Sequence, residues 1–461
     1  MPAGNHLNVV LIVIDAGRRS RFGCYGYTRG TTPVIDGLAR SGTIFERMIT
    51  TSAWTLPAHA SLFTGLYPRE HDAERPGYRM REGILTLAQH LDKHGYVTAV
   101  FSNNRLVSKS TGLVDGVSAT LRRHANDPAV PRPLVERLGV LVGQADRGAA
   151  RTNRRVQSFL QGTGGRPFFI FINYMECHGP YRPLRQYERR FVRRPFTLID
   201  SGRHRLRMRR RLAWDGLGWT PGELALLGDL YDASLAGLDA RIGDLLSILD
   251  RAGRGGETLV VITADHGEEL GEKGRWGHEL YLEQSLIHIP FIASIPGRPA
   301  ARAGGLVQVT DVFAGLCGVL ELPVPSHLQG RLFSADPFSL GPLDPGRPFA
   351  FSQWQEWQGG ALQRRLQRAP RFHPTPSAEA VQDRRYKLTV EPGTGAERLV
   401  DLSEDPAEVR NRAADLPAER QRLMDGLERW RALFQPVGTA TPYSAEEERA
   451  MTARLEEMGY L

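Results

Sequence analysis

The chain has 461 residues, of which 41% are hydrophobic and 24% are charged. A chain of this length can bury a large core, and this composition excludes a small disulfide-stapled protein and an intrinsically disordered one. Its longest apolar runs fall well short of the roughly 18 to 20 residues of a membrane span, so we expect no membrane anchor. The net charge of +8 suits an anionic substrate, an acidic surface or nucleic acid, and does not choose among them.

The cysteines and the N-terminus bear on where the protein acts. Three scattered cysteines, Cys24, Cys177 and Cys317, form neither a disulfide framework nor a zinc-type pair. The N-terminal residues lack a basic start followed by an apolar stretch, and a strand pattern begins almost at once. This pattern leaves no room for a signal peptide and predicts a cytoplasmic location. The sequence does not indicate the oligomeric state.

Four apolar, β-branched runs each lead into polar side chains. They cover residues 8–15, 96–102, 166–174 and 257–264. Runs of this kind are typical of buried parallel strands. The helical patterns between them predict an α/β fold with helices on both faces of a mostly parallel sheet. Because ligands in such folds bind beyond the carboxyl ends of the strands, the polar residues after each run are candidates for a functional site.

The rest of the chain indicates a second, smaller unit. A Thr-Pro-x-Glu capping box at residues 220–223 first predicts a long helix that ends near residue 252. The Pro- and Gly-rich stretch 342–348 then predicts a boundary between a catalytic domain over residues 1–342 and an α+β subdomain over residues 343–461. Within the subdomain we expect two strand-like pieces and one helical piece, at residues 349–353, 386–390 and 417–434.

Two arginine-rich stretches interrupt the regular pattern. They cover residues 121–155 and about 181–213. Such runs are usually a solvated face or a mobile insertion, and the alternative for the second is an electropositive lid over an anionic substrate. Nucleic-acid binding is a further alternative, but the stretch lacks the interleaved aromatic residues of a stacking platform. We therefore expect a small anionic ester rather than nucleic acid as the partner.

The segment SAWTLPAHASLFTG, residues 52–65, has the features of an anion-binding helix start. Pro57 and the small residues after it indicate a loop that leads into a helix N-terminus, where N–H groups and the helix dipole favour a phosphate or sulfate. Thr55 is then a candidate nucleophile, because a bound metal lowers the pKa of a coordinated hydroxyl. The alternative for Thr55 is a plain helix cap.

Hard-oxygen and imidazole ligands follow two of the predicted strands. Asp15 ends the first run, and Asp265 and His266 follow the last one, so all three are expected at one edge of the sheet. With Thr55 they supply four ligands of the types that zinc, manganese or calcium accept. The alternative for Asp265 and His266 alone is a strand-end turn with a capping Asp.

Two further histidines are expected near the same edge. His178 in ECHGPY and His278 in RWGHEL lie in glycine-containing turns with aromatic neighbours. Histidines at such positions can donate to the charge that develops on an ester oxygen. The alternative for each is an ordinary surface or core histidine.

Several segments occur in a specific combination and order. They are NVVLIVIDAGRRSRFGCYGY, WTLPAHASLFTGLYP, FINYMECHGPYRP, ITADHGEELGEKGRWGHELYLEQSLIHIPFIASIPG and the final LEEMGYL. Together they resemble the sulfatase family within the alkaline phosphatase superfamily, from residue 8 almost to residue 461. The resemblance implies an alkaline-phosphatase-like fold, in which a mostly parallel sheet is sandwiched by helices beside the smaller α+β subdomain.

The resemblance also implies roles for the residues at the sheet edge. It makes Asp15, Asp265 and His266 metal ligands, and Thr55 a nucleophile that also touches the metal. Arylsulfatases need a Cys or Ser at this place, which is oxidised to formylglycine. Because Thr55 cannot be so modified, a formylglycine mechanism is excluded. The T-x-P-x-H pattern instead resembles the phospho-acting branches: nucleotide pyrophosphatase/phosphodiesterases, phosphoglycerol transferases and phosphoethanolamine transferases.

Further roles are implied for residues around the anion. His178 and His278 resemble catalytic contacts to the non-bridging oxygens or to the leaving group. His59 falls where sulfatases place the Arg of their C/S-x-P-x-R motif, which implies a substrate contact. Asn103 or Asn104 resembles an amide that contacts the anion in some relatives.

The metal site departs from the sulfatase pattern in its carboxylates. Ala16 follows Asp15 where sulfatases commonly have a second Asp, and Ser20 stands where many relatives have Asp. The lower carboxylate count favours manganese or zinc, with calcium as a further possibility. We expect one metal ion, and Glu176 and His178 are the residues available near a second position.

The sequence therefore predicts a metal-dependent hydrolase that acts on phosphodiesters or phosphonate monoesters through Thr55. One alternative is hydrolysis of sulfate esters without formylglycine, and another is transfer of the phospho group to an alcohol acceptor. An anion-binding pseudoenzyme is the alternative outside the enzymes.

Overall fold

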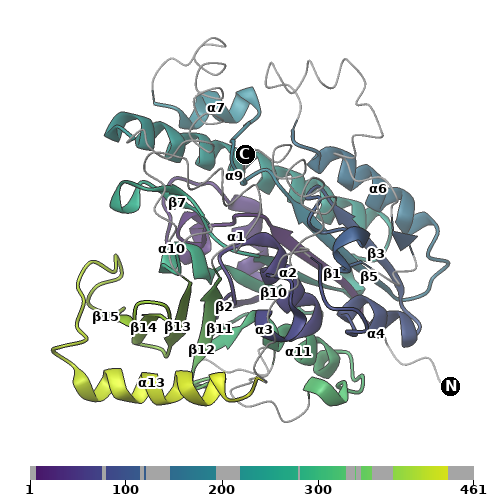
Figure 1. Ribbon diagram of the computed structural model, residues 1–461. Helices are drawn as coiled ribbons and strands as arrows, with labels where there is room; N and C mark the ends of the chain where they lie inside the picture. The colour runs from purple at the N-terminus through teal and green to yellow at the C-terminus, as the bar shows by residue number, and fades with distance from the viewer. Residues whose placement is uncertain are drawn as a thin grey trace, which may run out of the picture.

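In a computed structural model of the protein, the described residues are 7–74, 79–114, 119–120, 146–193, 219–278, 281–328, 338, 344–355 and 377–434. They form a large mixed sheet with helices on both faces and a smaller sheet toward the C-terminus (Figure 1). Among these residues, the structure contains no helix that is long and apolar enough to cross a bilayer.

The large sheet is centred on β1 (Asn8–Ile14). This strand pairs in parallel with β5 (Phe168–Tyr174) on one side and with β6 (Thr258–Ala264) on the other. The parallel array continues from β5 to β3 (Val97–Ser102) and then to the short β4 (Ala119–Thr120). The four predicted runs are thus confirmed as neighbouring parallel strands.

The other half of the large sheet was not predicted from the sequence. Beyond β6 lies β10 (Phe291–Ser294), which is antiparallel to β6 and to β2 (Thr43–Ile49). Strand β2 also pairs with β11 (Ala301–Gln308) in parallel and with β9 (His288–Ile289) in the antiparallel sense. The sequence TIFERMI of β2 carries charged residues in its middle, and β11 contains two glycines and a register shift. Neither strand therefore resembles a continuous apolar run.

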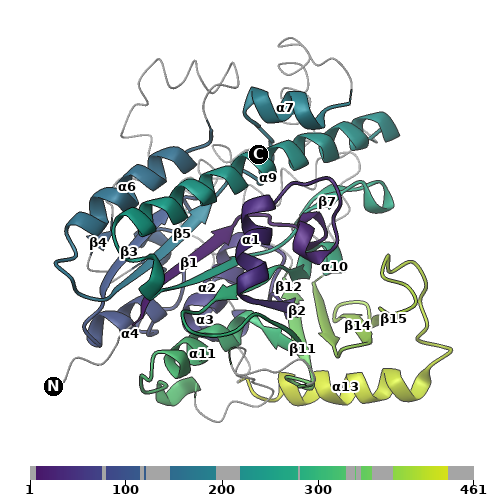
Figure 2. The same cartoon turned by 180° about the vertical axis from the view of Figure 1, so that it is seen from behind.

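Alternate residues of β1 pack into two separate cores, as expected for a strand that is covered on both faces. Val9, Leu11 and Val13 join a cluster with residues of α2, α4 and α11, whereas the intervening residues join one with α1, α6 and α9 (Figures 1 and 2). The structure thus has the predicted three layers. The helix bounds are α1 Pro33–Ser41, α2 Thr55–Thr64, α3 Pro68–His71, α4 Leu87–Lys93, α6 Ala149–Gln161, α7 Arg185–Phe191, α9 Pro221–Arg251, α10 Gln284–Ile287 and α11 Val312–Val319.

The long helix α9 begins at the predicted capping box. Thr220 Oγ1 accepts a hydrogen bond from the Glu223 amide at 3.3 Å, and Glu223 Oε2 accepts one from the Thr220 amide at 2.9 Å. These bonds satisfy backbone donors that the first helical turn leaves open. The helix packs against α1 and α6 on one face of the sheet, and α7 packs on it from outside (Figure 1).

A second unit, the C-terminal subdomain, consists of an antiparallel sheet and one helix. The sheet order is β12 (Ala350–Trp354), β13 (Ala378–Gln382), β14 (Tyr386–Glu391) and β15 (Ala396–Asp401). Helix α13 (Pro417–Arg431) covers it, and the ring of its Trp430 stacks on Phe351 with centroids 5.2 Å apart. The predicted smaller α+β unit is therefore present.

Strand β12 joins this subdomain to the chain that precedes α2. The Ser352 hydroxyl donates to the Thr50 carbonyl at 2.6 Å, and the Gln353 amide donates to the Thr51 carbonyl at 2.8 Å. A buried ion pair makes a second connection. Lys387 pairs with Glu408 and donates to the Leu282 carbonyl, and both charged side chains are almost completely buried.

Several predictions concern residues outside the described ranges. The predicted boundary at residue 342 lies in such a gap, as do residues 121–145 of the first arginine-rich stretch and 194–213 of the second. The described end of the first stretch is regular, because α6 begins at Ala149. The described start of the second stretch contains α7.

The Lys387–Glu408 pair gives a test of how the subdomain is attached. Lys387→Met leaves the Glu408 carboxylate buried without its cation, and we expect the free energy of unfolding to fall by about 3 kcal/mol. The double variant Lys387→Met/Glu408→Gln should recover most of this loss, because a glutamine at position 408 can still accept from the backbone amide of Gln284. This backbone nitrogen lies 2.6 Å from Glu408 Oε2. Urea unfolding measures the free energy of unfolding of both variants. A double variant as unstable as the single one would contradict this account.

Candidate active site

The register of three strands brings the predicted acidic residues together. Ile14 of β1 lies opposite Tyr174 of β5 and Ala264 of β6, so the residues that follow β1 and β6 emerge side by side at the carboxyl edge. These residues are Asp15 and Asp265, and both side chains are fully buried. Strand pairing thus brings the backbone of these two residues side by side.

Each carboxylate has one oxygen held by the protein. Asp15 Oδ2 accepts from the side-chain amides of Asn104 at 2.8 Å and Asn173 at 3.2 Å. Asp265 Oδ1 accepts from the backbone amides of Ala16 at 3.1 Å and His266 at 2.9 Å. The second oxygens, Asp15 Oδ1 and Asp265 Oδ2, are buried and have no hydrogen-bond partner among the described residues.

These buried oxygens fit a divalent cation. One ligand atom from each of Asp15, Asp265 and His266 lies within 4.8 Å of the others. Burial raises the pKa of Asp265 well above its ordinary value, and the charge of Asp15 adds to this effect. Burial also acts to raise the pKa of Asp15, but nearby histidines and the Asn104 amide outweigh it and lower the pKa. Two facing carboxylates with unsatisfied oxygens are costly to bury unless a positive charge lies between them.

Thr55 is the first residue of α2 and faces His266. Its Oγ1 lies 3.4 Å from His266 Nε2, and the side chain is buried. The helix begins at Thr55 itself, so Pro57 lies in its first turn and not in the loop that the sequence led us to expect. The backbone N–H groups of the first turn have no acceptor within the helix, and Pro57 has no N–H group. The Thr55 hydroxyl is therefore at the positive end of α2.

His59 lies one turn further along α2 and supports this arrangement. The side-chain amide of Asn173 donates to His59 Nε2 at 3.3 Å, so the proton of the neutral ring is on Nδ1, which donates to the Thr55 carbonyl at 2.8 Å. Burial lowers the pKa of His59 to about 4. Both ring nitrogens thus contact protein groups, and the ring links α2 to β5.

Three other histidines surround the pair of carboxylates. Nδ1 of His178 and of His266 contacts the carbonyl of the following glycine, at 2.7 and 2.8 Å, and Nδ1 of His278 lies 2.8 Å from Glu268 Oε1. These acceptors require the proton on Nδ1 and leave Nε2 on the opposite side of each ring. The His278 ring centroid lies 5.0 Å from that of His178 and 4.2 Å from that of His266. The structure thus brings all three together.

The two candidate asparagines differ in what they contact. The side-chain amide of Asn104 donates to Asp15, and its side-chain Oδ1 accepts from the backbone amide of Leu106 at 2.9 Å. The Asn103 side chain instead donates to Thr152 on α6 at 3.4 Å. Of these two asparagines, Asn104 is therefore the one that supports the Asp15 carboxylate.

Several site residues were missed by sequence reasoning. Asn173 donates to both Asp15 and His59, and its signal was one polar residue inside the apolar run of β5. Glu268 lies behind His278, and its Oε2 accepts from the Tyr181 hydroxyl at 3.0 Å. The sequence feature that could have identified Glu268 was its position directly after the Asp-His-Gly segment.

Glu176 bears on the predicted second metal position. Its Oε1 accepts from the amide of Ala149, the first residue of α6, at 3.0 Å. Burial raises its pKa to about 7. Among the described residues, the group with the geometry of a metal site is Asp15, Asp265 and His266, and Glu176 is not part of it.

Comparisons with known proteins identify the family. The model of the sulfatase family matches residues 7–322. Iduronate 2-sulfatase of Homo sapiens is 24% identical over 76% of this chain and 78% of its own, and the multifunctional alkaline phosphatase superfamily protein PehA of Trinickia caryophylli gives the same three figures. The chain belongs to the sulfatase family, and it is a hydrolase of ester bonds within the alkaline phosphatase superfamily.

Solved structures agree on the fold. The phosphonate monoester hydrolase of Agrobacterium radiobacter superimposes with a TM-score of 0.73 at 22% identity, covering 93% of this chain and 96% of that one. The corresponding hydrolase of Silicibacter pomeroyi gives a TM-score of 0.72 at 21% identity, over the same shares. The alkaline-phosphatase-like fold with its C-terminal subdomain is therefore established.

The different contacts of the two asparagines give a matched pair of variants. Asn104→Ala removes a donor to Asp15, and loss of such a supporting hydrogen bond is expected to weaken metal binding about tenfold or more. Asn103→Ala should leave the metal dissociation constant unchanged, because its amide contacts α6. Isothermal titration of the metal-free variants with Mn²⁺ compares them. Equal losses in both would show that Asn104 has no special role.

Proposed function

We propose that this sulfatase-family hydrolase acts on phosphodiesters or phosphonate monoesters with Thr55 as the nucleophile. The observation that carries the proposal is the position of the Thr55 hydroxyl. Thr55 is the first residue of α2, and its Oγ1 lies 3.4 Å from His266 Nε2, beside the two carboxylates. A hydroxyl at a helix N-terminus can bind and attack an anionic ester in one position.

A divalent cation held by Asp15, Asp265 and His266 would act as a Lewis acid toward the substrate and lower the pKa of the Thr55 hydroxyl. The ligand set mixes two carboxylates with one imidazole, which favours Mn²⁺ or Zn²⁺ and also allows Ca²⁺. We propose one such ion.

Each protein residue would have a defined part in the reaction. Thr55 Oγ1 forms a bond to phosphorus as the bond to the ester oxygen breaks. Because His178 and His278 carry their proton on Nδ1, Nε2 of one of them would take the proton of the Thr55 hydroxyl and pass it to the leaving oxygen. The product is a phosphothreonine and a free alcohol or phenol. Water then attacks the same phosphorus, and its proton passes through Nε2 of the same histidine to Thr55 Oγ1, which is released as the free hydroxyl. His59 holds the Thr55 carbonyl throughout.

Two observations favour phospho-group substrates. Threonine cannot form the formylglycine on which arylsulfatases depend, and phosphonate monoester hydrolases are among the similar solved structures. Iduronate 2-sulfatase and the other sulfatases among the relatives favour the alternative, sulfate-ester hydrolysis by unmodified Thr55. Transfer to an alcohol acceptor uses the same phosphothreonine. We also propose that the substrate is small and is met in the cytoplasm.

The substrate class can be tested with three 4-nitrophenyl compounds: the bis-phosphate diester, the phenylphosphonate monoester and the sulfate. We expect the first two to be hydrolysed by the Mn²⁺- or Zn²⁺-reconstituted protein, and Thr55→Ala to lower kcat by at least about a thousandfold, because the attacking oxygen is gone. Thr55→Ser keeps a hydroxyl and should retain measurable turnover. Turnover of the sulfate alone would favour the alternative, and full activity of Thr55→Ala would exclude Thr55 as nucleophile.

Removal of the metal gives an independent prediction. Dialysis against a chelator should abolish turnover of both phospho substrates, and added Mn²⁺ or Zn²⁺ should restore it, because without the ion no Lewis acid lowers the pKa of the Thr55 hydroxyl. The turnover of the Asp265→Asn variant should not be restored at the metal concentration that restores the wild type. Activity that survives complete chelation would contradict a metal-dependent mechanism.

A further inference from the structure

The turn after β1 holds the two carboxylates together through its backbone. Ala16 has φ of 58°, in the left-handed region that residues with a Cβ rarely adopt. In this conformation its amide points at Asp265 Oδ1, 3.1 Å away, although Ala16 is directly bonded to Asp15. One peptide therefore connects both candidate metal ligands, and it does so in a conformation that alanine disfavours.

The hydroxyl of Tyr231 is positioned to keep this turn in place. It donates to the Ala16 carbonyl at 2.8 Å and accepts from the Arg18 amide at 2.7 Å. These two bonds bracket the turn from Ala16 to Arg18. The ring is fully buried and packs edge-on against Tyr181, with centroids 5.5 Å apart, so the hydroxyl has little freedom to move away.

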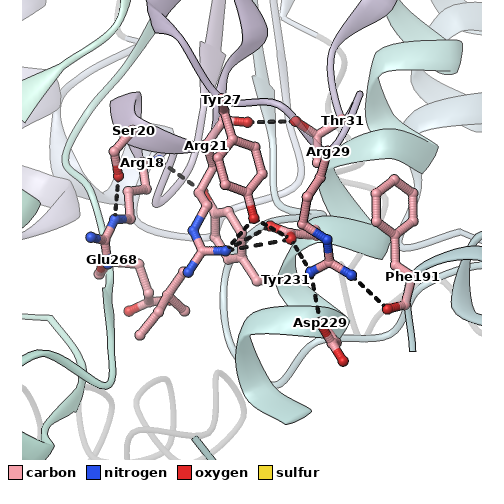
Figure 3. A network of polar contacts seen from close by, with 12 residues as sticks. Arg18, Ser20, Arg21, Tyr27, Arg29, Thr31, Phe191, Asp229, Tyr231 and Glu268 are labelled. Carbon is pink, nitrogen blue, oxygen red and sulfur yellow. Dashed lines mark hydrogen bonds and ion pairs between the residues drawn. The ribbon is translucent and has the colours of Figure 1, made fainter. Parts of the chain in front are cut away.

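Tyr231 is part of a rigid support on α9. Its neighbour Asp232 accepts from Arg21, Tyr27 and Arg29, which follow the turn along the chain, and Asp229 pairs with Arg29 (Figure 3). Figure 3 shows Asp229 and Tyr231 of α9 beside Arg21, Tyr27 and Arg29 of the loop that follows β1. The hydroxyl of Tyr231 contacts the backbone beside the metal ligand, whereas that of Tyr27 contacts Asp232 and Arg21.

We propose that Tyr231 is a positioning residue for the metal site. Its hydroxyl holds Ala16 in the left-handed conformation, and Ala16 in turn holds Asp265 beside Asp15. This inference rests on the proposed metal site, but it does not depend on which ester is the substrate. Tyr231 has no contact with the metal or the reacting atoms in this role.

The test is the affinity of the metal-free protein for Mn²⁺, measured by isothermal titration without substrate. Tyr231→Phe keeps the packed ring and removes both hydrogen bonds, and we expect its dissociation constant to rise about tenfold or more, as for other residues that support metal ligands. Tyr27→Phe removes a hydroxyl from the same network, away from Ala16, and should bind Mn²⁺ like the wild type.

A second variant tests the route through Ala16. Glycine adopts positive φ without the alanine penalty, so Tyr231→Phe/Ala16→Gly should recover part of the lost affinity. Should Tyr231→Phe fail to fold, recovery of folding in the double variant would support the same route, and its failure would contradict it. Wild-type affinity in Tyr231→Phe, or an equal loss in Tyr27→Phe, overturns the inference. A wild type that binds no metal overturns the proposed metal site itself.

Discussion

The site depends on the repulsion between two buried carboxylates. Asp15 and Asp265 emerge at matched positions of neighbouring parallel strands, and both side chains are buried from solvent. Amide donors satisfy one oxygen of each, and the other oxygen of each is buried without a hydrogen-bond partner among the described residues. The pKa values of the pair diverge, because burial and mutual charge raise that of Asp265, whereas surrounding histidines lower that of Asp15. The arrangement becomes favourable when a cation lies between them.

The histidines around this pair share one design. Each directs Nδ1 toward a carbonyl or carboxylate of the protein, which fixes the tautomer and the ring orientation. Burial lowers the pKa of His178 to about 4 and that of His278 well below its ordinary value, so the free protein holds these rings neutral. The positive charge that an anionic ester needs is therefore not stored in His178 or His278, which is consistent with a site completed by a metal ion.

Residues placed by strand ends could be predicted from the sequence, whereas residues placed by side-chain direction mostly could not. Asp15, Asp265 and His266 could be grouped because the ends of parallel strands meet at one edge. The choice between Asn103 and Asn104 stayed open, because adjacent residues point in different directions once a strand ends. Tyr231 lies in the middle of a long helix whose apolar pattern gives no sign that one hydroxyl reaches the loop after β1. Strands β2 and β11 were missed because charged residues and glycines mask their pairing.

The hydrogen bonds from β12 to Thr50 and Thr51 couple the position of the C-terminal subdomain to the start of α2. They place an edge strand of the C-terminal subdomain directly against the segment that leads to Thr55. A shift of that strand would be transmitted to the start of α2 within a few residues. The subdomain is thus part of the frame that aligns Thr55, the proposed nucleophile, and an exchange of this unit between relatives would have to preserve the β12 edge.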